Sequence, residues 1–147
     1  MDIMRMESGF LHWGHDISPE ENQYQAGLNF AISYKKPFNF IGKNKLLNIK
    51  DNKLDKKFAM FVLKDSKPGS PLLLHEEPIY LEDKIIGKTT SGNYSFNYNK
   101  NLSFGYINCD ISHDNLKDKN FYIEIEKIKY PANYLQSPLK RHNFKII

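Results

Sequence analysis

The period of the apolar residues changes once along this chain, and the change falls in a charged stretch at residues 51–57 (DNKLDKK). Before it, residues 40–50 place Ile41, Leu46 and Ile49 at the spacing of a short amphipathic helix. After it, apolar and polar residues alternate, as they do in half-buried strands. We therefore predict an α+β, β-rich fold, divided into residues 1–50, a linker at 51–57, and residues 58–147.

The second half is predicted to form short strands separated by turns. Segments with strand composition lie at residues 58–63, 79–81, 84–87, 102–107, 121–126 and 129–135. Glu82-Asp83 closes one predicted hairpin, a tight turn near Lys127 closes another, and proline and glycine mark a loop at residues 67–71. This arrangement is typical of a small antiparallel barrel or sandwich.

The first half gives weaker signals. Residues 1–8 resemble the end of a helix, which Gly9 can terminate in a left-handed conformation. Ser18-Pro19-Glu20-Glu21 has the order of a helix N-terminus, with Glu21 able to reach back to the Ser18 amide, and we expect a single turn there. Residues 26–34 (AGLNFAISY) are predicted to be a strand, because they are rich in aromatic and branched side chains.

Composition limits the class of protein. The 147 residues are 40% hydrophobic and 14% aromatic, which is enough for a sizeable core. There is no apolar run near the ~20 residues of a membrane helix, and no signal-peptide core at the start. Cys109 alone excludes an internal disulfide and fits a reducing compartment. We therefore expect a cytoplasmic protein with no membrane partner.

Charge does not indicate a nucleic-acid partner. The formal net charge is +4, but Arg5 and Arg141 are the only arginines among 21 basic residues. Arginine is the usual reader of guanine edges and phosphates, so we interpret the lysines as a solvated surface. The aromatics of Tyr94–Lys100 (YSFNYNK) could form a stacking surface for single-stranded nucleic acid, but alternating aromatics in strands usually belong to cores.

Three further patterns carry no predicted chemistry. His12 and His15 have the spacing of a metal-ligand pair, but His75, His113 and His142 are scattered and supply no second pair, so no metal site is predicted. The sequence of Gly87–Gly92 (GKTTSG) lacks the order of a phosphate-binding loop and predicts a β-turn. Cys109 has no partner base that the sequence indicates, so it is not predicted to be a nucleophile. No catalytic residue is assigned.

An ordered set of short motifs is more specific. It consists of RMESGF at residues 5–10, HWGHDISPE at 12–20, AGL at 26–28, FIGK at 40–43, PIY at 78–80, GKTTSG at 87–92, SFGY at 103–106, YPA at 130–132, and Pro138-Leu139. This order resembles the glycine-cleavage T-protein (aminomethyltransferase) family. The HWGHDI form is most similar to the T-protein-like domains of dimethylglycine and sarcosine dehydrogenases. The resemblance covers nearly the whole chain, but only the C-terminal part of that family.

The resemblance implies a fold, a cofactor and one site residue. Residues 1–50 would be the remnant of a folate-binding α+β domain, and residues 58–147 a T-protein C-terminal β-barrel. The implied chemistry is tetrahydrofolate-dependent one-carbon transfer from glycine or methylated glycines. Glu7 matches the carboxylate that holds the amino and imino groups of the pterin, and a carboxylate can accept two parallel donors. From the residues alone, Glu7 could equally be a helix-surface residue paired with Arg5 or bonded to nearby backbone.

The resemblance also implies an incomplete enzyme. The family's catalytic Asp lies in the portion of the folate-binding domain that this sequence does not match, so we do not expect turnover by this chain alone, and we expect weak or absent folate binding. The expected partner is a chain that supplies the missing half, or a second copy paired through an exposed edge of the strand at residues 26–34. Two alternatives stay open: a noncatalytic subunit of a two-chain folate enzyme, and a small basic barrel that binds single-stranded nucleic acid.

Overall fold

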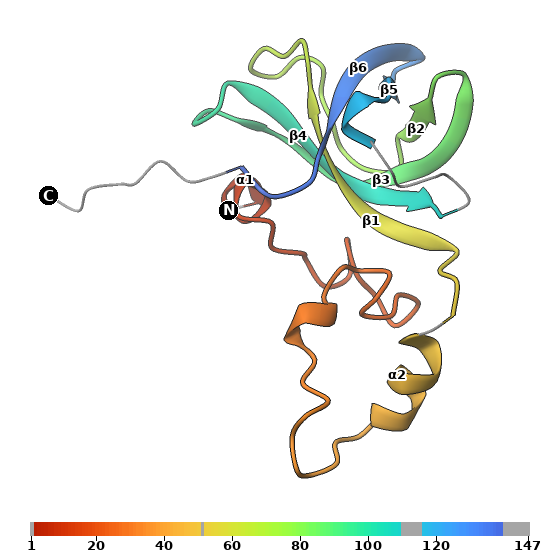
Figure 1. Cartoon of the computed structure of the whole chain (residues 1–147). Coiled ribbons are helices and arrows are strands. Elements are labelled where there is room, and N and C mark those ends of the chain that lie inside the picture. The colour runs from red at the N-terminus through yellow and green to blue at the C-terminus, as the bar shows by residue number, and fades with distance from the viewer. Residues whose placement is uncertain (1, 51, 110–115, 140–147) are drawn as a thin grey trace, which may run out of the picture.

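A computed structural model describes residues 2–50, 52–109 and 116–139. In this part of the chain six antiparallel strands close into a barrel in the order β1-β4-β3-β2-β5-β6, with β6 pairing back onto β1 (Figure 1). The strands are β1 (Lys56–Leu63), β2 (Pro78–Leu81), β3 (Lys84–Ser95), β4 (Lys100–Asn108), β5 (Phe121–Ile125) and β6 (Ile128–Leu135). The predicted antiparallel barrel is confirmed.

Alternating side chains fill the barrel. Along β1, Ala59, Phe61 and Leu63 are buried and the residues between them are half-buried, which is the period of two that the sequence shows. The ring of Phe61 meets that of Phe121 on β5 edge to face, with centroids 5.3 Å apart. Isoleucines from four further positions complete the interior: Ile79, Ile86, Ile107 and Ile123.

Two predicted turns are confirmed. Glu126 and Lys127 both have positive φ (51° and 64°), so two residues suffice to connect β5 to β6. The β2–β3 hairpin turns at Glu82-Asp83, where Glu82 has φ 55°. The remaining predicted strands have the expected places, although β1 begins at Lys56, inside the stretch assigned to the linker. Residue 51 of that linker, and residues 110–115 and 140–147 of the predicted second half, lie outside the described residues.

The prediction of a β-turn at Gly87–Gly92 is wrong. These residues lie in the middle of β3, where the pairing with β4 shifts register between Thr89 and Ser91. Gly87 reflects a close approach of two strands, because a Cβ there would lie 1.9 Å from the carbonyl oxygen of Tyr106 on β4. The glycine was therefore a signal for strand packing and not for chain reversal.

The N-terminal helix lies on the barrel. Helix α1 (Asp2–Glu7) contacts β3 and β4. It ends as predicted at Gly9, which has φ 76°, while the amides of Gly9 and Phe10 bond to the carbonyls of Met6 and Arg5. The buried side chain of Met6 packs with Leu102 and Phe104 of β4. The helix is thus attached by its apolar face to the wall of the barrel.

The prediction of a strand at residues 26–34 is wrong. The segment forms turns and one 3-10 helix (Asn29–Ala31), and Phe30 is 82% exposed. Gly27 has φ 71°, which an extended strand does not allow, and none of the strands in the described residues pairs with this segment. Its aromatic and branched residues gave it strand propensity, but propensity without a pairing neighbour does not produce a strand. The exposed-edge argument for a homodimer therefore has no strand to rest on.

The part of the N-terminal segment that follows residue 34 includes a second helix. Helix α2 (Lys43–Lys50) confirms that a short helix lies within residues 40–50, but it begins after Ile41, which is fully exposed and not part of an apolar face. The helix lies near the end of the barrel where β1 begins (Figure 1). It buries no residue completely, and Leu46 and Ile49 are half-buried. None of the helices in the described part of the chain has the length and apolar character needed to cross a membrane.

Hydrogen exchange should separate the two parts of the chain. We expect amides of residues 56–108 and 121–135 to exchange at least tenfold more slowly than those of residues 10–50, because the barrel is closed while the segment buries few side chains. Mass spectrometry after peptic digestion provides the measurement. Equal protection in both parts would contradict this assignment of stability.

Candidate functional site

The carboxylate of Glu7 is buried between α1 and the tip of the β3–β4 hairpin. Glu7 is the last residue of α1 and is 4% exposed. Ser95 Oγ donates a hydrogen bond to its Oε1, and Asn97 Nδ2 donates to its Oε2 over 2.9 Å. Each carboxylate oxygen therefore has one donor from the barrel.

Glu7 is not paired with Arg5, which was one possible interpretation of the sequence. The Arg5 guanidinium instead lies against Asp16, with Nη1 2.5 Å from Oδ2. It also donates from Nη1 to the Phe10 carbonyl and from Nη2 to Ser91 Oγ. The residues that hold Glu7, Ser95 and Asn97, are both neutral hydrogen-bond donors.

Asp16 is the centre of a second buried cluster, which sequence reasoning did not identify. It is 1% exposed. Its Oδ2 accepts from Arg5 and from the His12 amide, and its Oδ1 accepts from the hydroxyls of Thr90 and Ser91 at 2.6 and 2.8 Å. One carboxylate thus joins α1, the loop at residues 12–17 and strand β3.

This cluster explains why two of the sequence motifs occur together. The aspartate belongs to HWGHDI, and its hydroxyl partners belong to GKTTSG, more than 70 residues later. Tyr106 of β4 adds a hydrogen bond from its hydroxyl to the Asp16 carbonyl oxygen, and burial raises the pKa of that phenol. The spacing of residues within either motif gives no sign of this contact. Only the presence of both motifs in the same sequence could have suggested that they touch.

A second pair of contacts holds residues 18–25 against the start of β1. Lys56 Nζ lies 2.6 Å from Glu21 Oε1, and Gln25 Nε2 donates to Asp55 Oδ1 over 2.6 Å. The predicted bond from the Ser18 amide to Glu21 is present at 2.9 Å, in a turn that does not continue as a helix. Burial alone would raise the pKa of Glu21, but the bonds from Lys56 and Ser18 outweigh it and the pKa is lowered. The bond from Gln25 lowers the pKa of Asp55.

Acid should therefore weaken this attachment. Because both folded-state pKa values lie below the ordinary values of 4.5 and 3.8, the two carboxylates contribute their full stabilisation above those values and lose it as pH falls through the lowered ones. We expect the free energy of unfolding, measured in urea, to decline below about pH 4. A Glu21→Gln/Asp55→Asn double variant should show a flatter decline, and an identical decline would contradict this assignment.

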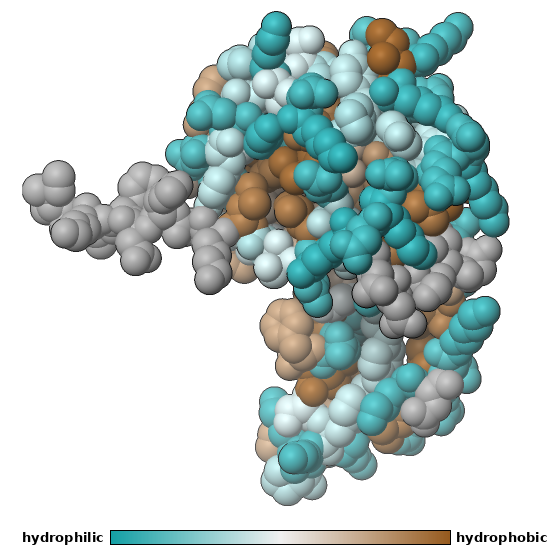
Figure 2. Space-filling model, turned by 45° about the horizontal axis from the view of Figure 1, so that its top comes forward, coloured by the Kyte–Doolittle hydropathy of each residue, from teal (hydrophilic) through white to brown (hydrophobic). Residues whose placement is uncertain are grey.

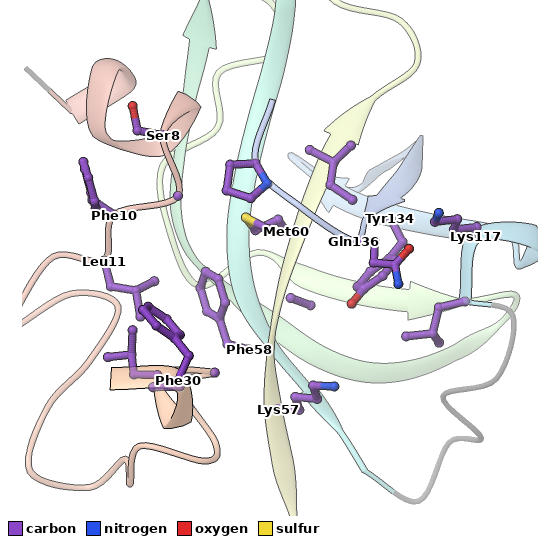
Figure 3. Close-up of a pocket in the computed structure, with 18 of the residues that line it drawn as sticks. Ser8, Phe10, Leu11, Phe30, Lys57, Phe58, Met60, Lys117, Tyr134 and Gln136 are labelled. Atoms are coloured by element: carbon purple, nitrogen blue, oxygen red, sulfur yellow. The ribbon is translucent and has the colours of Figure 1, made fainter. Parts of the chain in front are cut away.

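A groove of about 780 Å³ separates the N-terminal segment from the barrel. Figure 3 shows Phe10, Leu11 and Phe30 on one side, facing Phe58 and Met60 of β1 on the other. Tyr134 and Gln136 close the far side (Figure 3). In the space-filling view, apolar side chains are exposed on the barrel face and again on the segment beyond it (Figure 2).

The remaining candidate residues do not converge on one site. The rings of His12 and His15 stack 4.7 Å apart, and the described residues include no group of three His, Cys, Asp or Glu side chains that could hold a metal ion. His113 and His142 lie outside the described residues. Cys109 follows β4 and is half-buried. Of the hairpin aromatics, Tyr94 is buried, Tyr98 is half-buried and Phe96 is exposed.

Comparison with known proteins identifies the barrel. Residues 56–140, more than half of the chain, match the family model described as the glycine cleavage T-protein C-terminal barrel domain. The chain belongs to the glycine cleavage T-protein family. The T-protein barrel expected from the sequence is therefore confirmed, and the match begins at the first residue of β1.

Relatives extend the similarity to the N-terminal segment. The chain is 33% identical over 137 residues to an aminomethyltransferase of Listeria innocua. This alignment covers 93% of this chain and 36% of that protein. It is 32% identical over 143 residues to a mitochondrial dimethylglycine dehydrogenase of Rattus norvegicus, covering 95% of this chain and 16% of that protein. A 4-methylaminobutanoate oxidase (formaldehyde-forming) of Paenarthrobacter nicotinovorans is 32% identical over 140 residues, with 94% and 16% covered.

A solved structure shows the same fold. The aminomethyltransferase T of the glycine cleavage system from Bartonella henselae matches with a TM-score of 0.79 at 18% identity, over 95% of this chain and 37% of that chain. The T-protein family resemblance is thus supported by sequence and by fold. The chain spans about a sixth to about a third of the length of the curated relatives it matches.

Proposed function

We propose that this chain is the C-terminal part of a tetrahydrofolate-dependent one-carbon transferase of the T-protein type, and that Glu7 binds the pterin edge of the folate. The observation that carries the proposal is the burial of one carboxylate with both oxygens aimed by the barrel, at the position that the family resemblance assigns to pterin binding. When bound, tetrahydrofolate supplies the nitrogen that receives the one-carbon unit.

The Glu7 carboxylate fits the pterin edge of tetrahydrofolate in its hydrogen-bonding chemistry. A charged carboxylate forms short, strong bonds with a ligand edge that presents two N–H donors. The contribution of Glu7 is binding and orientation, because no other titratable side chain is bonded to it in the described part of the chain that could move a proton. The role that we propose for this chain in the transfer is therefore to hold the pterin.

The expected partner is the remaining part of the folate-binding domain, either in the same polypeptide or in a second one. The exposed aromatic side chains of the N-terminal segment support this proposal: Phe10, Trp13, Phe30 and Phe38 are each more than 60% exposed. Several exposed large apolar side chains on one short segment are typical of a surface that another protein or domain covers. Since the chain aligns with only 36% of the Listeria innocua aminomethyltransferase, the unmatched part of such a protein is the natural cover.

The nucleic-acid alternative has less support. A stacking platform needs several exposed aromatics in a row, whereas the hairpin exposes Phe96 and buries Tyr94. The noncatalytic-subunit alternative differs from the proposal only in where the remaining domain is encoded. The folate titration described next therefore tests the proposal and the noncatalytic-subunit alternative together.

We expect Glu7→Gln to weaken folate binding in a reconstituted assembly. The chain is mixed with the N-terminal part of Listeria innocua aminomethyltransferase that it does not match, and tetrahydrofolate is titrated by calorimetry. A hydrogen bond to a charged group is worth about 1.5–3 kcal/mol, so losing the charge should weaken binding roughly 10- to 100-fold. The chain alone should bind at about 1 mM or weaker, because association itself costs at least ~4 kcal/mol.

The matched control is Glu20→Gln, which neutralises an exposed carboxylate of the same segment and should bind folate as the wild type does. Equal affinity of the Glu7→Gln and wild-type assemblies would contradict the proposed role of Glu7. Micromolar binding with turnover by this chain alone would contradict the requirement for the rest of the domain.

A further inference from the structure

The positive charge of this chain is concentrated in one stretch, residues 35–53, which we call the basic tip. It holds six lysines and a single acidic residue, Asp51, for a net charge of +5. The rest of the chain has 15 basic and 16 acidic residues, so its net charge is −1. We propose that the basic tip binds the anionic headgroups of a lipid surface, as a peripheral contact that goes beyond the proposed function.

The exposed lysines of the basic tip form no ion pair. They are Lys35, Lys36, Lys45, Lys50 and Lys53. None of the five pairs with a carboxylate in the described part of the chain. Two of them, Lys36 and Lys50, lie over aromatic rings, a contact that does not neutralise their charge. Like charges so close in the sequence repel one another, and an anionic surface relieves that repulsion.

Two exposed aliphatic side chains lie among these lysines. Ile41 is 104% exposed and Leu47 is 40% exposed. The amide of Lys43 bonds to the carbonyl of Phe40, and Gly42 between them has φ 86°, as in a type II turn with Ile41 at its outer corner. Such side chains can enter the boundary between headgroups and acyl chains, which removes their apolar surface from water.

The lipid contact needs only these two aliphatic residues and the lysines. Phe38 of the same stretch is assigned above to the contact with the remaining part of the folate-binding domain. The expectation of no membrane partner rested on the lack of a spanning segment in the sequence, and a contact at the lipid surface needs no such segment.

The position of the basic tip leaves it accessible to a flat surface. Figure 1 shows α2, and the segment that precedes it, at the opposite end of the molecule from β2, β5 and β6. On this part of the surface hydrophilic and hydrophobic side chains are interspersed (Figure 2). Because the rest of the chain is close to neutral, an anionic surface attracts the tip and so orients the molecule with the barrel away from it.

The chemistry of the basic tip favours a lipid surface over other polyanions. Nucleic acid is bound by arginine forks and stacked aromatic rings, whereas lysine is a point charge and isoleucine and leucine have no ring face. Interfaces between proteins are depleted in lysine. Attraction to an anionic lipid surface needs only positive charge near the plane and apolar side chains that enter it.

The test is co-sedimentation of the full chain with vesicles of phosphatidylcholine, either alone or with about 30% phosphatidylserine. We expect the chain to pellet only with the anionic vesicles, and to be released when salt is raised from about 0.05 to about 0.5 M, because salt screens the attraction. A Lys45→Ala/Lys53→Ala variant should bind roughly 25-fold more weakly, since each lysine near the surface contributes about fivefold. Ile41→Ser should bind about tenfold more weakly.

The matched control is Lys64→Ala/Lys117→Ala, which removes two exposed lysines outside the basic tip and should bind as the wild type does. If the wild type does not pellet with anionic vesicles, or the folded Lys45→Ala/Lys53→Ala variant binds as tightly as the wild type, the inference is overturned. Unchanged binding by Ile41→Ser would overturn the insertion of that side chain. Binding to a single-stranded RNA oligomer without binding to vesicles would overturn the lipid assignment in favour of a nucleic-acid surface.

Discussion

Replacing Asp16 by asparagine should lower the free energy of unfolding by about 3–5 kcal/mol, because the half-buried guanidinium of Arg5 loses its buried counter-charge and keeps only the exposed Asp2 carboxylate, 3.4 Å from Nε. The Arg5 side chain is 17% exposed and the Asp16 side chain 0%. Asparagine keeps the volume of aspartate, so the loss reports charge and hydrogen bonding and not a cavity. Since domains of this size have a total stability of about 5–15 kcal/mol, the effect is large. Urea denaturation followed by far-UV circular dichroism measures it.

An exposed ion pair provides the control for Asp16. Asp83 lies 3.5 Å from Lys129 and its side chain is fully exposed, so Asp83→Asn should give no measurable change. A double-mutant cycle with Arg5→Met should show that the effects of Asp16→Asn and Arg5→Met are not additive. Additive losses would mean that the two residues stabilise the protein independently, contrary to the contact described above.

Replacing Phe61 by alanine should cost about 3–5 kcal/mol, because the ring is fully enclosed at the centre of the barrel. It packs edge to face against Phe121 and against Tyr134, with centroids 5.3 and 5.9 Å apart. The loss combines the transfer of the ring to water with the cavity that remains among β1, β5 and β6. Thermal and urea denaturation both report it.

The same substitution at Phe30 is the matched control. Phe30→Ala removes an identical side chain from a position that is 82% exposed, and should change stability by about 0.5 kcal/mol or less. If both variants lose equal stability, the core does not lie inside the barrel. The contrast also tests whether the aromatics of the N-terminal segment contribute to folding or only to an interface.

The barrel could be predicted from the sequence because its strands follow a local rule. The period of two in residues 58–63 places Phe61 and Leu63 inside without any knowledge of the neighbouring strands. The turn at Glu126-Lys127 is equally local. Gly87–Gly92 was misassigned because its glycine responds to a strand elsewhere in the chain, and spacing along the sequence contains no record of that neighbour.

The candidate site could be predicted only in part, and on other grounds. Glu7 was identified through the family resemblance, not through any physical pattern around it. Its partners Ser95 and Asn97, and the whole cluster around Asp16, depend on which strand face meets α1. A serine or threonine in a strand gives no sign that a carboxylate from the other end of the chain will bond to it. The strand expected at residues 26–34 failed in the opposite way, since local propensity was present and a pairing partner was not.

The long sequence separation of the α1 contacts determines the order in which the molecule can assemble. The bonds from the barrel strands and the β3–β4 turn to Asp16 and Glu7 join residues 74 to 90 positions apart, so they close large loops and form late. On the ribosome the first fifty residues emerge well before β3 and β4 exist to receive them. Until the β3–β4 hairpin forms, Arg5, Glu7 and Asp16 remain charged groups in water, and the aromatic side chains around them are open to chaperones and to other chains. The carboxylate clusters therefore cannot form before the β3–β4 hairpin has been synthesised.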